Sequence, residues 1–230
     1  MAYQKLHQLI LDGNWEQLNA TFAAMTHTEF RRASMYLRTS VLPVLENNVC
    51  WEAIFHLVQY RRQAFLSCVL ALQPLALSGR LDFSCQGAQA FAVYLLQEAP
   101  EAVPKVVNMV LPFLQTDGQV DAFFHTFRVE DKKQQVLALL KVESPLAYYL
   151  LFTRLRHLPD CRQFALDCCR YIMRRDNDMA YNMVAIMQAY FGLYELRGQF
   201  SLRIAPYELS LLDRDAQSFY HVLNGKRPQL

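Results

Sequence analysis

Three cysteines and a histidine crowd into residues 157–169, and thiols beside an imidazole are the groups that bind zinc or carry out redox chemistry. Cys161, Cys168 and Cys169 follow His157 in this stretch. A zinc site needs three or four ligands that converge on one ion. On a helix Cys161 and Cys168 are two turns apart, roughly 10 Å along the axis, which is too far to chelate one ion directly. We therefore expect no metal and no cofactor here.

The same cysteines fit the buried side of a helix. With about 100° per residue, Cys161, Ala165, Cys168 and Ile172 share one stripe, and Cys169 extends it. Neighbouring cysteines such as Cys168 and Cys169 point about 100° apart on a helix and do not form an ordinary disulfide. The pattern predicts thiols that act as small apolar side chains in a core.

Composition restricts the classes of protein that the chain can belong to. It has 230 residues, of which 53% are hydrophobic and 19% charged, so disorder is excluded and a sizeable core is expected. Only seven residues are glycine, which argues against sandwiches, barrels and Rossmann domains. The net charge of +2 is too small to indicate nucleic acid or an anionic membrane as the partner.

Cysteine usage and hydropathy favour a cytoplasmic protein. Because the chain is so apolar, its six cysteines are expected to be free thiols in a reducing compartment rather than partners in stabilising disulfide bonds. The apolar run before Asp12 is too short for the core of a secretory signal. The apolar segment 179–196 is at the lower limit for crossing a bilayer and is interrupted by Asn182, Gln188 and Glu195, so we expect a helix of a soluble protein and no membrane partner.

Capping patterns along the chain predict where helices begin. Each pattern has a side chain that can accept a hydrogen bond from a backbone N–H in the first helical turn. The five predicted caps are Asn14, Thr26, Ser144, Asp160 and Asp178. Proline is expected to end or kink helices, because it lacks an N–H and its ring clashes with the preceding turn. The four prolines concerned are Pro43, Pro74, Pro104 and Pro112.

Nearly every segment reads as helix. The predicted ranges are 2–11, 15–25, 28–40, 49–60, 63–77, 86–98, 101–115, 119–127, 130–141, 145–157, 161–174, 179–196 and 207–223. Residues 78–87 are predicted to be a loop or a possible subdivision of one helical domain that spans 1–230, and 197–206 an extended loop.

The spacing of these helices predicts the architecture. Successive pairs begin near residues 15, 49, 86, 119, 145 and 179, and most steps are about 33–37 residues, the length of a helical-hairpin repeat. The tetratricopeptide and ankyrin signatures are absent. We expect an all-α protein whose hairpins form an α-solenoid-like superhelical stack, resembling HEAT and tetratricopeptide arrays in rhythm only. The alternative is a compact multi-helix bundle.

No catalytic signature is present: the chain has no Gly-rich phosphate loop, no G-x-S-x-G elbow and no H-E-x-x-H. We therefore favour a non-catalytic helical-repeat module that binds a protein or peptide through a concave face. The candidate partner-binding residues lie at helix ends, at positions that the apolar core does not obviously require. They are Tyr60, Arg61, Arg62, Arg154 and Arg175.

Two other functions remain open. Arginines at the ends of stacked hairpins could form a basic strip for phosphates, as in a nucleic-acid-binding helical-repeat protein. That class includes DNA-repair alkylpurine glycosylases of similar size and helical class, although no motif matches. The second alternative is a helical regulator or immunity-type inhibitor that acts through surface complementarity.

Overall fold

The structure, a computed structural model, describes residues 2–175 and 177–196. Every regular element in this part of the chain is a helix, and no strand occurs in it. The expectation of an all-α protein is confirmed. The chain forms two compact units, Met1–Val129 and Glu130–Leu230. The predicted loop 197–206 and helix 207–223 lie outside the described residues.

The first unit contains the α-helices that precede residue 130. They are α1 (Ala2–Leu11), α2 (Trp15–Ala23), α3 (His27–Tyr36), α4 (Asn47–Phe65), α5 (Gln73–Leu77), α6 (Gln86–Glu98), α7 (Val103–Val110) and α8 (Asp117–Thr126). Between them lie a π-helical segment, η1 (Leu37–Val41), and four 3-10 segments, η2 (Leu42–Val44), η3 (Leu66–Leu72), η4 (Pro100–Ala102) and η5 (Leu111–Phe113).

The described part of the second unit is also helical. Its elements are α9 (Lys132–Leu139), α10 (Pro145–Leu155), α11 (Cys161–Ile172), η6 (Met173–Arg175), α12 (Asp178–Phe191) and η7 (Tyr194–Leu196). The predicted helices lie near their predicted positions in the described chain, but several differ in bounds or type. The predicted helix 179–196 ends at Phe191, because Gly192 adopts a left-handed conformation (φ 61°) before η7 begins. The predicted helix 63–77 is divided, because α4 runs on to Phe65 and the 3-10 segment η3 separates it from α5.

Three of the five predicted caps are present. The side chains of Asn14, Thr26 and Ser144 accept hydrogen bonds from backbone N–H groups of α2, α3 and α10. The prediction for Asp160 was wrong, because this residue adopts a left-handed conformation (φ 53°) and makes no capping bond. The prediction for Asp178 was wrong by one position: Asn177 caps α12 and accepts a hydrogen bond from the Ala180 N–H at 2.8 Å.

The four prolines lie where α-helical geometry changes. Pro43 lies in η2, directly after the π-helical η1, and Pro112 lies in η5, directly after α7. Pro74 and Pro104 lie in the first turns of α5 and α7, each directly after a 3-10 segment. The expectation that these residues end or kink helices holds for Pro43 and Pro112, whereas Pro74 and Pro104 stand at helix starts, where the missing N–H is tolerated.

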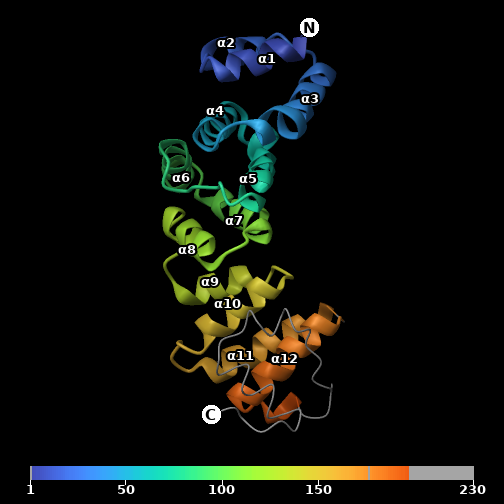
Figure 1. Ribbon diagram of the computed structural model, residues 1–230, viewed down its shortest axis with the longest axis vertical. Coiled ribbons are helices and arrows are strands. Elements are labelled where there is room, and N and C mark those ends of the chain that lie inside the picture. The colour runs from blue at the N-terminus through green and yellow to red at the C-terminus, as the bar shows by residue number, and fades with distance from the viewer. Residues whose placement is uncertain (1, 176, 197–230) are drawn as a thin grey trace. The chain divides into compact units, whose positions relative to one another are not determined.

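Packing in the first unit places alternate helices beside one another. α4 packs against α6, and α6 against α8, and these three helices follow one another along one side of the unit (Figure 1). The buried ring of Trp51 in α4 lies 5.8 Å from Phe91 of α6 and 5.9 Å from Phe83, measured between ring centroids. Phe123 and Phe127 extend this aromatic cluster to α8 and its end.

Two asparagines at the start of α4 hold the segment that leads into α6. The amide of Asn47 makes a paired contact with the main chain of Asp82, donating to its carbonyl oxygen at 2.9 Å and accepting from its N–H at 3.0 Å. Oδ1 of Asn48 accepts from the Gly87 N–H at 3.0 Å. The stretch 78–87, predicted as a loop, thus connects α5 to α6 inside the first unit.

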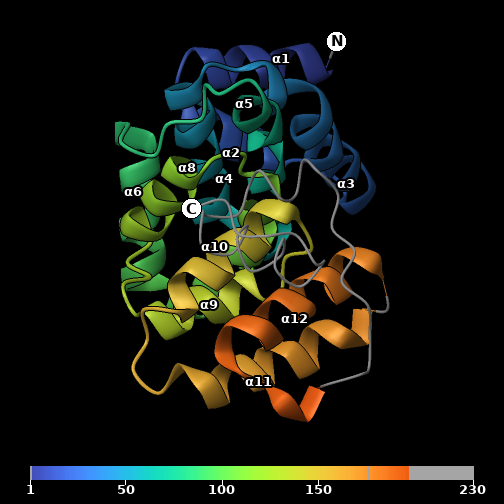
Figure 2. The same cartoon turned by 60° about the horizontal axis from the view of Figure 1, so that its bottom comes forward.

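The second unit is built around α12. α11 and α12 pack side by side (Figure 2), and the Cys169 Sγ lies 3.9 Å from the Met187 Sδ in the buried contact between them. Phe152 of α10 meets Tyr190 of α12 edge to face. On the surface, Nη2 of Arg162 donates to both carboxylate oxygens of Glu195 at 2.8 and 2.9 Å, and this exposed pair adds little to stability.

Candidate binding groove of the first unit

One wall of the candidate site is a single face of α3 and η1. Thr26 and Glu29 form a reciprocal capping box that starts α3. From this start, Arg31, Ser34 and Met35 follow at helical spacings, and Arg38 continues the same stripe one turn later. All four line a cavity of about 260 Å³.

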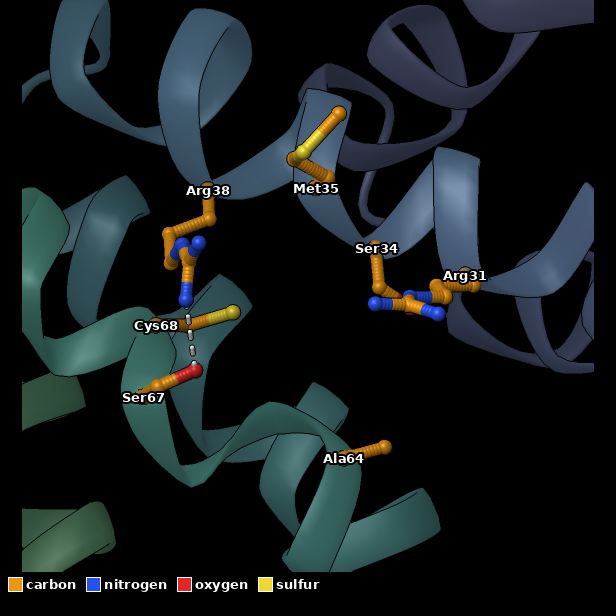
Figure 3. A pocket seen from close by; sticks show the side chains of 7 residues that line it. All are labelled: Arg31, Ser34, Met35, Arg38, Ala64, Ser67 and Cys68. Atoms are coloured by element: carbon orange, nitrogen blue, oxygen red, sulfur yellow. Dashed lines mark hydrogen bonds between the residues drawn. The ribbon is translucent and has the colours of Figure 1, made fainter.

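The opposite wall comes from the end of α4 and from η3. Ala64, Ser67 and Cys68 have the same spacing of three and four residues and line the same cavity (Figure 3). A second cavity of about 330 Å³ adjoins the first, because Arg31, Ser34 and Ala64 line both. The second cavity is completed by His27, Phe30, Arg61 and Gln63. We call the two adjoining cavities the basic groove.

Both walls are irregular helices. The π-helical η1 precedes Pro43, and the 3-10 segment η3 precedes Pro74, so each proline coincides with a change of helical pitch beside the groove. In α4, Arg61 has non-helical angles (φ −150°, ψ 81°) that kink the helix. Short π and 3-10 interruptions of this kind are frequent at functional sites and hinges.

Two contacts fix arginines of the groove in place. Nη1 of Arg38 donates a hydrogen bond to the Ser67 hydroxyl at 3.2 Å, and this bond joins η1 to η3 (Figure 3). The Arg61 guanidinium carbon lies 4.8 Å from the ring centroid of Phe30, a cation–π distance. Phe30 is held in turn by edge contacts with Phe22 and Phe65 of the core. The two cations are therefore positioned by the fold.

Positive charge in the groove has no counter-charge within the described chain. Arg31, Arg38 and Arg61 line it, and no described carboxylate lies within 4.0 Å of their guanidinium nitrogens. No aspartate or glutamate lines either cavity. Arginine guanidinium groups with free N–H donors bind carboxylates and phosphates, often in bidentate fashion. The groove is thus suited to an anionic ligand.

The groove holds one thiol, and that thiol is not a nucleophile. Cys68 is almost fully buried, and burial raises its pKa to about 12, although the charge of Arg38 opposes the shift. A thiol with that pKa remains protonated at neutral pH, whereas thiolates carry out cysteine chemistry. The Ser34 hydroxyl donates to the Phe30 carbonyl oxygen at 2.8 Å, so its proton is also engaged. The arrangement can bind an anion, and neither group is prepared to attack one.

The structure divides the five predicted binding residues between the two units. Arg61 lines the groove, and the half-exposed ring of Tyr60 stacks on Phe22 at 5.9 Å. Arg62 turns the other way, donating to the Glu98 carbonyl oxygen and pairing with Glu101 at 3.2 Å.

The remaining two residues lie in the second unit and have internal partners. Nε of Arg154 donates to Gln135 at 3.0 Å. The guanidinium of Arg175 donates to the carbonyl oxygens of Leu140 and Val142 and to the Tyr148 hydroxyl. These contacts connect η6 with the end of α9 and with α10.

Sequence reasoning missed Arg31 and Arg38. The sequence does contain a pattern that could have indicated these two residues. A single helix face carries, at intervals of three and four residues, Arg31, Ser34, Met35 and Arg38. A stripe that carries two cations and no acid is unusual for a purely solvated helix face. The composition of the partner wall, however, depends on where α4 kinks, which spacing alone does not predict.

Two of the three cysteines of residues 161–169 are part of the core, as expected, and the third is not fully buried. Cys168 and Cys169 are buried, and burial raises the pKa of both thiols, that of Cys168 to about 12. Cys161 is half-buried at the start of α11. Within residues 2–175 and 177–196, no three His, Cys, Asp or Glu side chains come close enough to hold a metal ion.

No protein-family description, curated protein or solved structure matches the chain. None of the described helices combines the length and the apolar character needed to span a bilayer.

Proposed function

We propose that the chain is a non-catalytic helical-repeat interaction module that binds an anionic segment of a partner protein in the basic groove. The observation that carries the proposal is the lining of the groove: Arg31, Arg38 and Arg61 have no carboxylate partner among the described residues. Uncompensated positive charges that line adjoining cavities repel one another, and an anionic ligand relieves that repulsion.

A peptide suits the groove better than a small molecule or a duplex. The volume of each cavity is near or below the low end of the range of about 300–1,000 Å³ that is usual for drug-sized ligands. Because the two cavities adjoin, they offer consecutive subsites for neighbouring side chains of one ligand. The exposed side chain of Met35 supplies apolar surface beside the cations. Alternating apolar and charged contacts are what consecutive side chains of an extended peptide need.

The repeat character belongs to the same proposal. It is supported by the order in which α4, α6 and α8 pack within the first unit and by the regular spacing of helix starts. We place the module in the cytoplasm, since its buried Cys50, Cys68, Cys168 and Cys169 would be kept as thiols there.

The proposal is tested by fluorescence anisotropy with a labelled pool of acidic peptides. We expect saturable binding to the wild-type protein. The double variant Arg31→Glu/Arg61→Glu should weaken binding at least about tenfold, because charge-assisted hydrogen bonds contribute about 1.5–3 kcal/mol each. Both side chains are exposed, so the variant should fold normally.

Arg32→Glu/Arg80→Glu is the matched control. It changes the net charge by the same amount, but neither residue lines the groove. This control should bind within about twofold of the wild type, apart from weak long-range effects that salt removes. Equal losses in both double variants, or tighter and competing binding of a single-stranded oligonucleotide, would reject the peptide-binding function.

A further inference from the structure

We infer that the segment bound in the basic groove is phosphorylated, and that its phosphoserine or phosphothreonine occupies the inner cavity between Arg31 and Arg38. The inference rests on the proposed function and specifies the chemistry of the ligand. The inner cavity is the one lined by α3, η1, the end of α4 and η3, with a volume of about 260 Å³ (Figure 3). Its size suits one side chain, not a whole ligand.

The polar groups around this cavity are arranged to donate. Arg38 uses one N–H on Ser67 and keeps its others, and Arg31 has no partner among the described residues. The Ser67 hydroxyl accepts from Arg38, so its own proton is free for a ligand oxygen. Two guanidinium groups and one hydroxyl thus face the cavity from opposite walls, and no acidic residue lines it.

A phosphomonoester matches this donor set better than a carboxylate. It carries a charge of about −1.5 to −2 at neutral pH and three terminal oxygens, whereas a glutamate has a charge of −1 and two oxygens. Arg31 and Arg38, seven residues apart on one wall, can each bind one edge of the phosphoryl group. With Arg61 nearby, the uncompensated charge of the groove is +3, which one carboxylate leaves mostly unneutralised.

The outer cavity accounts for the residues next to the phosphorylated one. It shares Arg31, Ser34 and Ala64 with the inner cavity, so a bound chain can pass from one to the other. The Arg61 guanidinium, which lies over the nearly buried Phe30 ring, offers a flat cationic surface there. The Cys68 thiol is buried and protonated, and the Ser34 hydroxyl donates to the Phe30 carbonyl oxygen, so neither group is prepared to accept the phosphoryl group.

The test compares degenerate peptide pools that differ only at the central residue: phosphoserine or phosphothreonine, serine or threonine, and glutamate. Binding is measured by fluorescence anisotropy. We expect the phosphorylated pool to bind at least about tenfold more tightly than the glutamate pool. Arg31→Gln and Ser67→Ala should remove most of this preference, because each should weaken binding of the phosphorylated pool more than binding of the glutamate pool. Arg32→Gln, on the same helix outside the cavity, should retain the preference.

The remaining outcomes distinguish a failure of the phosphate inference from a failure of the proposed function. Equal affinity for the phosphorylated and glutamate pools would overturn the phosphate inference while leaving the proposed function intact. Absence of binding to every pool would overturn both. Tighter binding to phosphatidic-acid vesicles or to a single-stranded oligonucleotide than to the phosphorylated pool would overturn the inference as well. Competition by inorganic phosphate that is lost in Arg31→Gln would support it.

Discussion

The backbone N–H of Gly87 donates a hydrogen bond to Oδ1 of Asn48 at 3.0 Å, and this bond brings the first turn of α6 directly against the first turn of α4. A Cβ on residue 87 would lie 2.7 Å from the Glu52 backbone nitrogen and 2.9 Å from the Asn48 carbonyl oxygen. Both atoms belong to the main chain of α4 and cannot rotate away. The helix contact therefore requires glycine at this position.

Gly87→Ala should destabilise the protein by about 1–3 kcal/mol, the usual cost of overpacking a closely packed contact. Urea denaturation followed by circular dichroism measures the change. Gly118→Ala is the control, because Gly118 also lies in a helix and a Cβ there would meet nothing within 4 Å. It should be neutral or stabilising by up to about 1 kcal/mol. Similar effects of the two substitutions would contradict the close approach of α4 and α6.

Arg175→Lys should destabilise the second unit by about 2–3 kcal/mol. The guanidinium of Arg175 reaches two carbonyl oxygens and the Tyr148 hydroxyl at the same time, and a lysine ammonium lacks the planar geometry to replace these bonds. The neighbouring exposed Arg174 has no such contacts, so Arg174→Lys should change the free energy of unfolding by less than about 0.5 kcal/mol. Thermal and urea unfolding of both variants measure these changes. An equal loss in the free energy of unfolding for the two variants would contradict the structural role of Arg175.

Stability should fall as the pH drops below about 6.5, partly because of His56. Its ring stacks on Trp15 at 4.3 Å with an interplanar angle of 16°, and also touches Phe55. Burial lowers the pKa of His56, although the charge of Glu52 opposes the shift. The unfolded chain therefore takes up the proton more readily. The contribution to stability is complete above the unfolded pKa and declines as pH falls towards the lower folded pKa.

Urea denaturation between pH 8 and pH 5 compares the wild type with His56→Phe, which keeps a stacked ring but does not titrate. The variant should lose less stability than the wild type as the pH falls through this range. Parallel pH profiles of the two proteins would show that His56 makes no contribution.

Thiol labelling should separate the six cysteines into two groups. Burial raises the pKa of Cys50, Cys68 and Cys168 to about 12 and raises that of Cys169 as well, so these four should react only when the protein unfolds. Cys85 and Cys161 are half-buried and should be modified first in the native protein. In a Cys85→Ser/Cys161→Ser variant the early phase should disappear. An early phase that persists there would mean that a core thiol is accessible.

The helical architecture followed from the sequence because its causes are local. The capping boxes, the prolines and the apolar periodicity of residues such as Cys168 and Cys169 act within one or two turns. Asp160 shows the limit of this reasoning: the residue type suits a cap, but its backbone adopts the left-handed region, where the side chain makes no capping bond.

The candidate site could be predicted only in part, because it depends on two walls that are distant in the sequence. Arg61 was selected for its place at a helix end and does line the groove. Arg31 and Arg38 can be recognised as site residues only when the fold is known, because η3 places Ser67 opposite them. The hydrogen bond between Arg38 and Ser67 joins residues 29 positions apart in the sequence. The helical-wheel pattern gives the stripe on α3, but the kink at Arg61 and the π-helical η1 depend on tertiary packing, which outweighs local propensity.

The most direct test of the basic groove as a binding site is side-chain NMR of the arginine Nε–Hε groups during titration with the phosphorylated peptide pool. We predict saturable shifts of the Arg31, Arg38 and Arg61 signals, with those of Arg32 and Arg80 unchanged, and loss of the shifts in Arg31→Gln. Shifts confined to arginines outside the groove, or no shift at saturating peptide, would contradict the account.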